Sequence, residues 1–221
     1  MMREKVPVFS AVIFDMDGVI FDTEKLVLQC WQEVADKYHI PDIKAACTEC
    51  LGLNQEATVE KFLQRYGKDF PYAEYKAEMR DLFFGPMYGE HLPIKPGVEE
   101  LLQGLKENHI PTALATSTRT EMVLKELEDA GLRSYFDKII CGDMVAHSKP
   151  HPEIFVRACE ELQVRPCEAF AVEDSFNGIR AAHAGGLMPV MVPDMLEPTP
   201  EILELVHAVF PSLKELKQYL L

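Results

Sequence analysis

A short apolar run that ends in two acidic residues is the feature that most constrains this sequence. Residues 11–14 are Ala, Val, Ile and Phe, an apolar set typical of a strand buried on both faces of a parallel sheet. Asp15 and Asp17 follow on alternate positions, with Gly18 directly after them. A simple turn is the alternative interpretation. Because an unpaired buried carboxylate is costly, we instead expect a divalent cation at this end of the strand, where open α/β sheets bind ligands.

The charge balance narrows the possible partners. The 221 residues carry 22 Lys and Arg against 36 Asp and Glu, a formal net charge of −14. Nucleic acids and anionic membranes bind basic surfaces, so we expect neither as a partner. The first apolar run is too short for a signal peptide, and no stretch approaches the length of a membrane span. We therefore expect a cytoplasmic monomer that binds an anionic substrate through a local cluster of cations or a metal.

The six cysteines lack the regular spacing of a disulfide framework, which indicates reduced thiols. Cys47 and Cys50 have the CxxC spacing of redox and zinc motifs. No second Cys or His pair follows at the spacing of metal ligands. We interpret the two as ordinary thiols in a helical segment, with a redox or zinc role as the alternative.

A helical block precedes a region in which strands and helices alternate. Apolar side chains recur at three- and four-residue steps in three segments, which are residues 25–38, 55–66 and 72–87. From Pro96 onward, helical patterns alternate with short apolar strands, as in parallel α/β sheets. The sequence therefore predicts a Rossmann-like, doubly wound parallel sheet formed by residues 1–23 and 93–221. A small α-helical cap domain, residues 24–92, would be inserted after the first strand.

Polar side chains follow the predicted strands at the points where these strands end. The later strands are predicted at residues 111–115, 138–141, 169–172 and 189–192. Thr116 follows the first of these, Glu173 and Asp174 follow the third, and Lys149 precedes a nearby helix. Because the carboxyl ends of parallel strands meet at one edge of a sheet, we expect these four residues to gather around Asp15.

With these residues considered together, the chain resembles the haloacid dehalogenase superfamily of phosphohydrolases. Within it, the chain is similar to the β-phosphoglucomutase-like phosphatases, whose helical cap follows the first strand. The resemblance covers essentially the whole chain and depends on four motifs in the family's order and spacing. These are Asp15-Met16-Asp17-Gly18, Thr116, Lys149 before Pro150, and Glu173-Asp174-Ser175.

The resemblance implies a Mg²⁺-dependent phosphatase that acts through an aspartyl-phosphate. Asp15 would be the nucleophile, and Asp17 would be the general acid that protonates the leaving oxygen. The carboxylates of Asp15 and Asp174 and the main-chain carbonyl of Asp17 would hold the Mg²⁺. Glu173 would assist the cation directly or through water. The expected substrate is a small phosphorylated metabolite, whose identity the sequence does not specify.

The resemblance also implies a phosphate site. Lys149 and Thr116 would hold the phosphoryl oxygens, supported by main-chain N–H groups. The remaining candidates for phosphate or substrate contacts are Met16, Gly18 and Ser117 beside the motifs, Gly52, Asn54 and Gln55 in the cap, and Arg119. Thr118 with Glu121 fits a helix capping box, and we predict only that role for Thr118.

Three other activities are open to a chain of this kind. Dehalogenases of the superfamily lack the second acid, so Asp17 argues against halide chemistry. Sugar phosphomutases of the superfamily carry a histidine on the first cap helix and a basic grip for a second phosphate. Here Val27 falls near the histidine position and residues 51–55 contain no basic residue, so hydrolysis is favoured over phosphotransfer. A non-catalytic phosphate- or metal-binding protein is the third possibility.

Overall fold

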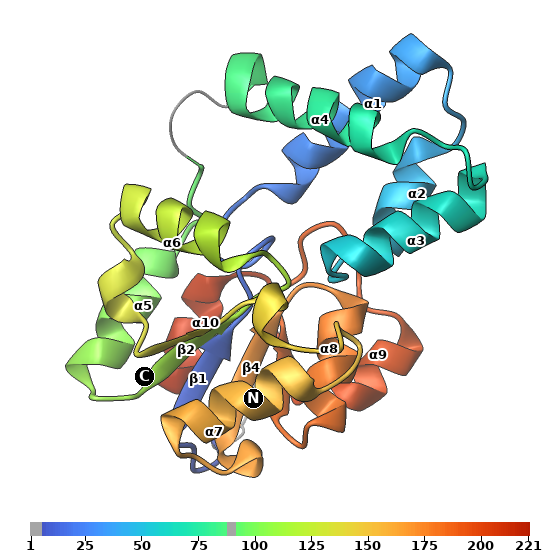
Figure 1. Cartoon of the computed structure of the whole chain (residues 1–221). Helices are drawn as coiled ribbons and strands as arrows, with labels where there is room; N and C mark the ends of the chain where they lie inside the picture. The colour runs from blue at the N-terminus through green and yellow to red at the C-terminus, as the bar shows by residue number, and fades with distance from the viewer. Residues whose placement is uncertain (1–5, 88–91) are drawn as a thin grey trace.

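The computed structural model describes residues 6–87 and 92–221. In this part of the chain, one parallel sheet of six strands lies among the helices of the lower part of the molecule in Figure 1. The strand order is β3-β2-β1-β4-β5-β6. The strands are β1 (Ala11–Phe14), β2 (Thr112–Ala115), β3 (Lys138–Ile140), β4 (Ala169–Glu173), β5 (Met188–Met191) and β6 (Ala208–Val209). This order places β1 between β2 and β4, where the direction of winding reverses and doubly wound folds bind ligands.

Alternate side chains of β1 enter two different hydrophobic clusters, as the two-residue period of a strand requires. Val12 and Phe14 pack on one face of the sheet, and Ala11 and Ile13 pack on the other. All four side chains are fully buried. The apolar run is therefore explained by helices on both faces, which confirms the predicted doubly wound architecture.

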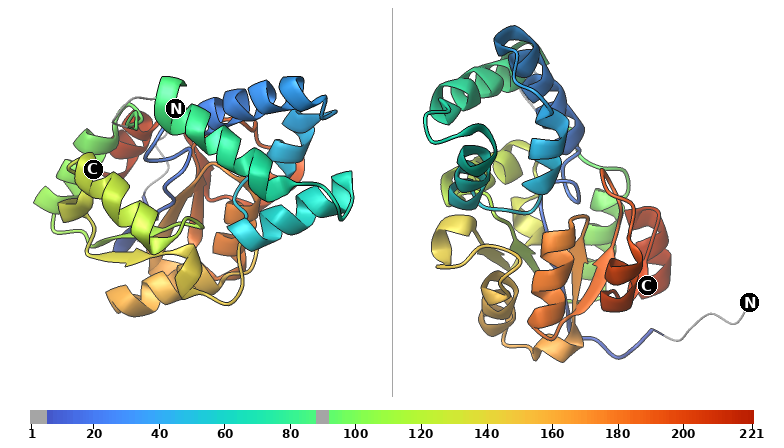
Figure 2. Two further views of the ribbon diagram at one scale, coloured as in Figure 1. Left: turned by 45° about the horizontal axis from the view of Figure 1, so that its top comes forward. Right: turned by 90° about the vertical axis from the view of Figure 1, so that its right-hand side faces the viewer.

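Helices cover both faces of the sheet. They are α5 (Val98–Glu107), α6 (Thr120–Asp129), α7 (Glu153–Leu162), α8 (Phe176–Ala184), α9 (Pro200–Leu205) and α10 (Leu213–Leu220). Leucines of α5 and α10 pack against the face that carries Phe14. Residues of α7 and α8 pack against the opposite face, which is rich in alanine and so allows these helices to approach closely. Figure 2 shows the two helical layers from the side.

The helices between β1 and α5 have a hydrophobic core of their own. They are α1 (Glu24–Tyr38), α2 (Ile43–Glu49), α3 (Gln55–Tyr66) and α4 (Tyr72–Leu82), followed by a π-helical turn at Phe83–Met87. The Trp31 ring lies 5.2 Å from the Phe62 ring and 5.8 Å from the Tyr72 ring. These helices lie above the sheet in Figure 1. Their separate core supports the division into cap and sheet domains, whose boundaries at residues 23/24 and 92/93 stay our proposal.

Two linkers that run side by side join the helical block to the sheet domain. The Asp22 N–H donates to the carbonyl of Pro93 at 2.8 Å, and the Lys95 N–H donates to the carbonyl of Ile20 at 2.9 Å. Lys25 in the first turn of α1 and Lys95 in the second linker both pair with the buried carboxylate of Asp194, at 3.1 and 2.9 Å. One core carboxylate therefore contacts both the first cap helix and the second linker.

Several elements end a residue or more away from their predicted bounds, and two of these differences matter here. The helix predicted over residues 72–87 is α-helical only to Leu82, because Pro86 cannot donate the hydrogen bond that an α-helix interior needs there. Strand β4 extends one residue beyond the predicted range and ends on Glu173 itself. In the described residues, no helix is both long and apolar enough to cross a bilayer.

Candidate active site

The four sequence motifs meet at the carboxyl ends of β1, β2 and β4. Lys149 lies in the loop before α7 and is 1% exposed. Its Nζ donates to Asp15 Oδ1 at 2.7 Å, to Glu173 Oε1 at 2.6 Å and to the carbonyl of Ala115 at 3.1 Å. Although burial opposes a charge on Lys149, its attraction to Asp15 and Glu173 raises its pKa. The lysine is therefore a fixed cation shared by two acids that are 158 positions apart in the sequence.

Asp15 is buried at the end of β1. Burial raises the pKa of its carboxyl group from 3.8 to about 7; Glu173 adds to this rise and Lys149 opposes it. A cation bound beside Asp15 would favour the ionised form, which is the form that can act as a nucleophile.

Asp17 is half-buried and has different partners. Its Oδ1 accepts a hydrogen bond from Thr23 Oγ1 at 3.1 Å, and its Oδ2 accepts one from Thr118 Oγ1 at 2.9 Å. The capping role predicted for Thr118 is wrong, because Arg119 is the N-cap residue of α6 and the Thr118 hydroxyl is used by Asp17. Asp17 thus has hydrogen-bond partners of its own and lines the same cavity as Asp15.

Glu173 accepts hydrogen bonds at both carboxylate oxygens. Oε1 accepts from Lys149, and Oε2 accepts from the N–H groups of Asp174 and Ser175 and from Ser175 Oγ, at 2.9 to 3.1 Å. The Ser175 hydroxyl in turn accepts from the Gly178 N–H and so caps α8. These contacts indicate that Glu173 holds Lys149 and the start of α8. That Glu173 also assists in binding a cation stays a prediction.

Asp174 is the acid best placed to hold a cation. It is 2% exposed, and its Oδ1 has no hydrogen-bond partner in the described part of the chain. A β-carbon on Gly18, which has φ +78°, would lie 2.2 Å from Asp174 Oδ2, so only glycine allows this approach. Oxygens of Asp15, Glu173 and Asp174 all lie within 4.8 Å of one another. Burial, together with Glu24, Glu173 and other acids, raises the pKa of Asp174. This set of hard oxygen ligands fits Mg²⁺.

The residues predicted to bind phosphate divide into two groups. Thr116 is buried at the end of β2, where its Oγ1 accepts from the Thr118 N–H at 3.1 Å, and it lines the cavity with Ser117. The Gly18 N–H, in contrast, donates to the carbonyl of Phe21 at 2.9 Å, so the predicted phosphate contact is not supported there. The Met16 side chain is in the hydrophobic core, which leaves only its main chain for such a contact.

A cavity of about 990 Å³ lies between the cap helices and the sheet edge. Asp15, Asp17 and Thr116 form part of its wall, and Gly52, Gln55 and Arg119 also line it, as expected. The Asn54 side chain accepts from the Ala57 N–H at 2.9 Å and caps α3, and its substrate contact stays a prediction. The volume is large enough for a small phosphorylated metabolite.

The sequence motifs do not include several polar side chains near the site. Lys76 and Arg80 of α4 line the cavity, and Glu24 and Asp194 approach Asp174. For Glu24 the only available signal was its position directly after Asp22 and Thr23. Cys47 and Cys50 also line the cavity, and burial raises their pKa values to about 12 and about 11, which fits the interpretation as unreactive thiols.

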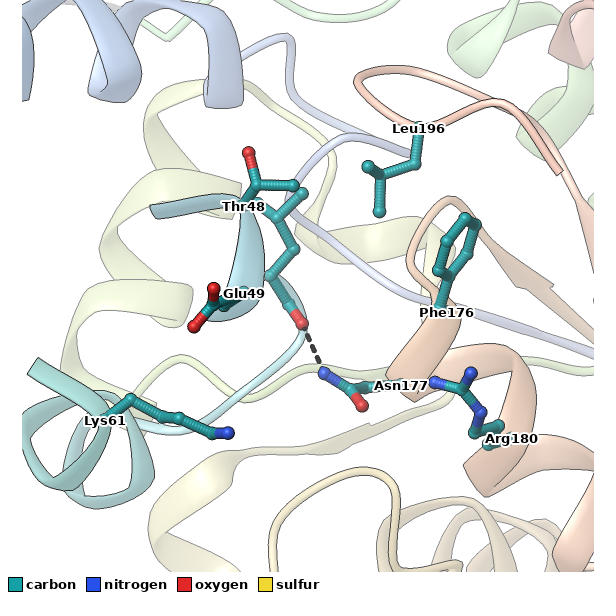
Figure 3. A pocket seen from close by; sticks show the side chains of 8 residues that line it. Thr48, Glu49, Lys61, Phe176, Asn177, Arg180 and Leu196 are labelled. Carbon is teal, nitrogen blue, oxygen red and sulfur yellow. Dashed lines mark hydrogen bonds between the residues drawn. The ribbon is translucent and has the colours of Figure 1, made fainter. Parts of the chain in front are cut away.

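A smaller pocket of about 230 Å³ lies where the cap meets α8 (Figure 3). The Asn177 side chain of α8 donates to the carbonyl of Leu51 at 2.9 Å, the dashed line in Figure 3. Ser117 Oγ donates to the carbonyl of Gly52 at 3.0 Å. Side chains of the sheet domain thus hold the cap segment that follows α2.

Comparisons with known proteins agree with this geometry. A family model for haloacid dehalogenase-like hydrolases matches residues 12–192. The phosphorylated carbohydrates phosphatase of Thermotoga maritima is 33% identical over 178 residues, which are 80% of this chain and 82% of that protein. The β-phosphoglucomutase of Bacillus subtilis is 31% identical over 191 residues, 83% of each chain.

A solved structure extends the similarity to three dimensions. The crystal structure of a mutant of CbbY from Rhodobacter sphaeroides, in complex with xylulose-(1,5)-bisphosphate, superposes with a TM-score of 0.77. The two sequences are 27% identical, and the match covers 95% of this chain and 96% of that one. The similarity therefore includes the helical block as well as the sheet.

Proposed function

Because this chain belongs to the haloacid dehalogenase-like hydrolases, we propose that it is a Mg²⁺-dependent phosphatase of a small phosphorylated metabolite. The observation that carries the proposal is the buried arrangement of Asp15, Lys149 and Asp174. Lys149 contacts the nucleophile candidate at 2.7 Å, and Asp174 brings an unpartnered oxygen to the same pocket. Positioned charges of this kind provide most of the catalysis in phosphoryl transfer.

Asp15 would attack the phosphorus atom and carry the phosphoryl group as an aspartyl-phosphate. Asp17, held by Thr23 and Thr118, would protonate the leaving oxygen and then accept a proton from the attacking water. Lys149 keeps the Asp15 carboxylate oriented and offsets its charge. These roles require Asp15 ionised and Asp17 protonated at the start of turnover.

The bound Mg²⁺ would supply positive charge to the phosphoryl oxygens and favour the ionised form of Asp15. Asp15 and Asp174 would hold it through their carboxylates, and Asp17 through its main-chain carbonyl. The unpartnered Asp174 Oδ1 and the space left by Gly18 support this assignment.

Sugar phosphate phosphotransfer is the second candidate, and one observation favours it. Residues 51–55 lack a basic side chain, but Lys76 and Arg80 bring two cations into the cavity from α4. They could bind a second anionic group of a substrate. Val27 lines the cavity where the mutases of this family carry a histidine, and that difference favours hydrolysis.

A panel of sugar, nucleotide and glycolytic phosphates, assayed for phosphate release with Mg²⁺ and with EDTA, tests the proposal. We expect hydrolysis of at least one sugar phosphate in Mg²⁺ and none in EDTA. Asp15→Asn should abolish turnover and keep the fold, and it should weaken Mg²⁺ binding because one carboxylate ligand is lost. Phosphate and Mg²⁺ binding without turnover of any ester would favour a binding protein, and isomerised sugar phosphate without released phosphate would favour the mutase. Substantial hydrolysis by Asp15→Asn would remove Asp15 from its role.

A further inference from the structure

A second group of carboxylates overlaps the predicted cation site. Oxygens of Glu24, Asp174 and Asp194 lie within 4.8 Å of one another. They come from the first turn of α1, the residue after β4 and the loop after β5. Each acid also has one buried oxygen without a hydrogen-bond partner among the described residues, namely Glu24 Oε2, Asp174 Oδ1 and Asp194 Oδ2. Buried polar atoms nearly always have partners, so three acids that lie this close and each keep an oxygen unpartnered among the described residues point to a cation as their common ligand.

Only one of the two carboxylate oxygens of Asp194 takes part in its ion pairs with Lys25 and Lys95. Its side chain is 1% exposed, and Oδ1 lies 3.1 Å from Lys25 Nζ and 2.9 Å from Lys95 Nζ. Oδ2 is the oxygen that has no hydrogen-bond partner in the described part of the chain. If Asp194 served only to pair with the two lysines, each of its oxygens could contact one of them. Instead, both lysines contact Oδ1, and Oδ2 is left for another ligand.

The local balance of charge leads to the same conclusion. Asp15 and Glu173 share Lys149, and Asp194 has two lysines. Glu24 and Asp174 have no ion pair with a cationic side chain within residues 6–87 and 92–221. Two buried charges of the same sign so close together need a compensating cation.

We propose that Glu24 and Asp194 are positioning residues for the divalent cation and add two carboxylates to the site around Asp174. The inference rests on the proposed function, because it requires a cation at Asp174. It has a structural consequence. Glu24 is the first residue of α1, and Asp194 pairs with Lys25 of α1 and with Lys95 of the second linker, so the cation site is continuous with the junction between cap and sheet domain.

Mg²⁺ affinity, measured by isothermal titration calorimetry on the full chain, tests this inference without an activity assay. Glu24→Gln should weaken Mg²⁺ binding by about 10- to 100-fold, the usual effect of losing a residue that supports a metal ligand. Glu56→Gln is the matched control, because Glu56 also lies in the first turn of a cap helix but is exposed. It should leave the affinity unchanged.

Lys95→Met is a second variant, for which we expect the opposite change in Mg²⁺ affinity. Removing this cation leaves more of the Asp194 charge available, so Mg²⁺ should bind more tightly than to the unchanged chain. A purely structural role for the acids predicts no such gain. Unchanged Mg²⁺ affinity in both Glu24→Gln and Lys95→Met would overturn the inference and leave the proposed function intact. Failure of the unchanged chain to bind Mg²⁺ would overturn both.

Discussion

Asp17 differs from the other site acids because two threonine hydroxyls hold it at the edge of the cavity. This position suits a group that exchanges protons with a leaving oxygen. Asp17→Asn should therefore slow turnover by about 10²-fold or more, the usual contribution of general acid catalysis. Because Asn can accept one of these hydrogen bonds through its carbonyl oxygen and donate its amide N–H to the other threonine hydroxyl, the melting temperature should change little. Steady-state kinetics and a thermal melt measure both, and a loss of only a few-fold would mean that the proton comes from another group.

Lys149 is expected to stabilise the fold as well as the reaction. Lys149→Met would leave Asp15 and Glu173 buried without their shared cation, and breaking such a buried pair costs about 3–5 kcal/mol. Urea denaturation near neutral pH measures the change in unfolding free energy. Lys125→Met is the control, because Lys125 pairs with Asp129 on the surface and its loss should not change the midpoint measurably. Equal midpoints for the two variants would contradict the stabilising role.

The sequence motifs predicted which residues meet at the site, because parallel strands bring their carboxyl ends together. They did not predict the partners of each side chain. Thr118 was read from its neighbours as a cap, but its hydroxyl bonds to Asp17, 101 positions away. Gly18 was read as a phosphate ligand, but its N–H is used by Phe21. Competition between local and distant partners depends on distances that exist only in the folded chain.

At the scale of elements, α8 is fitted closely to the end of β4. A β-carbon on Gly178 would lie 1.8 Å from Glu173 Oε1, and that oxygen is bonded to Lys149. A glycine-to-alanine change within a helix usually stabilises it by about 0.5–1 kcal/mol. Gly178→Ala should instead destabilise the protein by about 1–3 kcal/mol, as overpacking of a buried site does.

Gly85→Ala is the matched control for this change, because a β-carbon on Gly85 would have no atom within 4 Å among the described residues. Chemical denaturation of both variants gives the comparison. If Gly178→Ala were as stable as the parent, Glu173 would have to be free to move away, and its role in holding Lys149 would need revision.

The order of the elements was predictable because hydrophobic periodicity and Gly or Pro positions mark them locally. Helix α3 has the bounds that the sequence pattern indicated. The ends of other elements depend on contacts between residues that are far apart in the sequence. Strand β4 includes Glu173, a charged residue that the apolar pattern left out, because Lys149 compensates its charge inside the fold.

At the scale of the whole molecule, the sequence indicated a helical insertion but not how it faces the sheet. Lys76 lies in a helix whose periodicity shows only that one side is polar. Its place in the cavity depends on how α4 packs against α1, which involves residues of both helices. Whether the cavity can bind a substrate with one phosphate or with two depends on this packing. A local sequence motif does not reveal the packing.

Asp15, Glu24 and Asp174 together predict how stability depends on pH and on Mg²⁺. Burial raises the pKa of all three carboxyl groups, that of Asp15 from 3.8 to about 7. Between these values the folded state binds protons that the unfolded chain has released. In EDTA, these three carboxyl groups therefore make the free energy of unfolding fall as pH rises through this range.

A bound divalent cation would replace those protons, so Mg²⁺ should stabilise the protein more at about pH 7.5 than at about pH 5.5. Thermal melts at both pH values, with Mg²⁺ and with EDTA, measure the difference. Asp15→Asn removes one of the titrating groups and should reduce the pH dependence of the Mg²⁺ effect. Equal stabilisation by Mg²⁺ at the two pH values would show that the cation does not compete with protons for these acids. The cation would then have to bind at other residues, and the pocket between Lys149 and Asp174 would lose its proposed role.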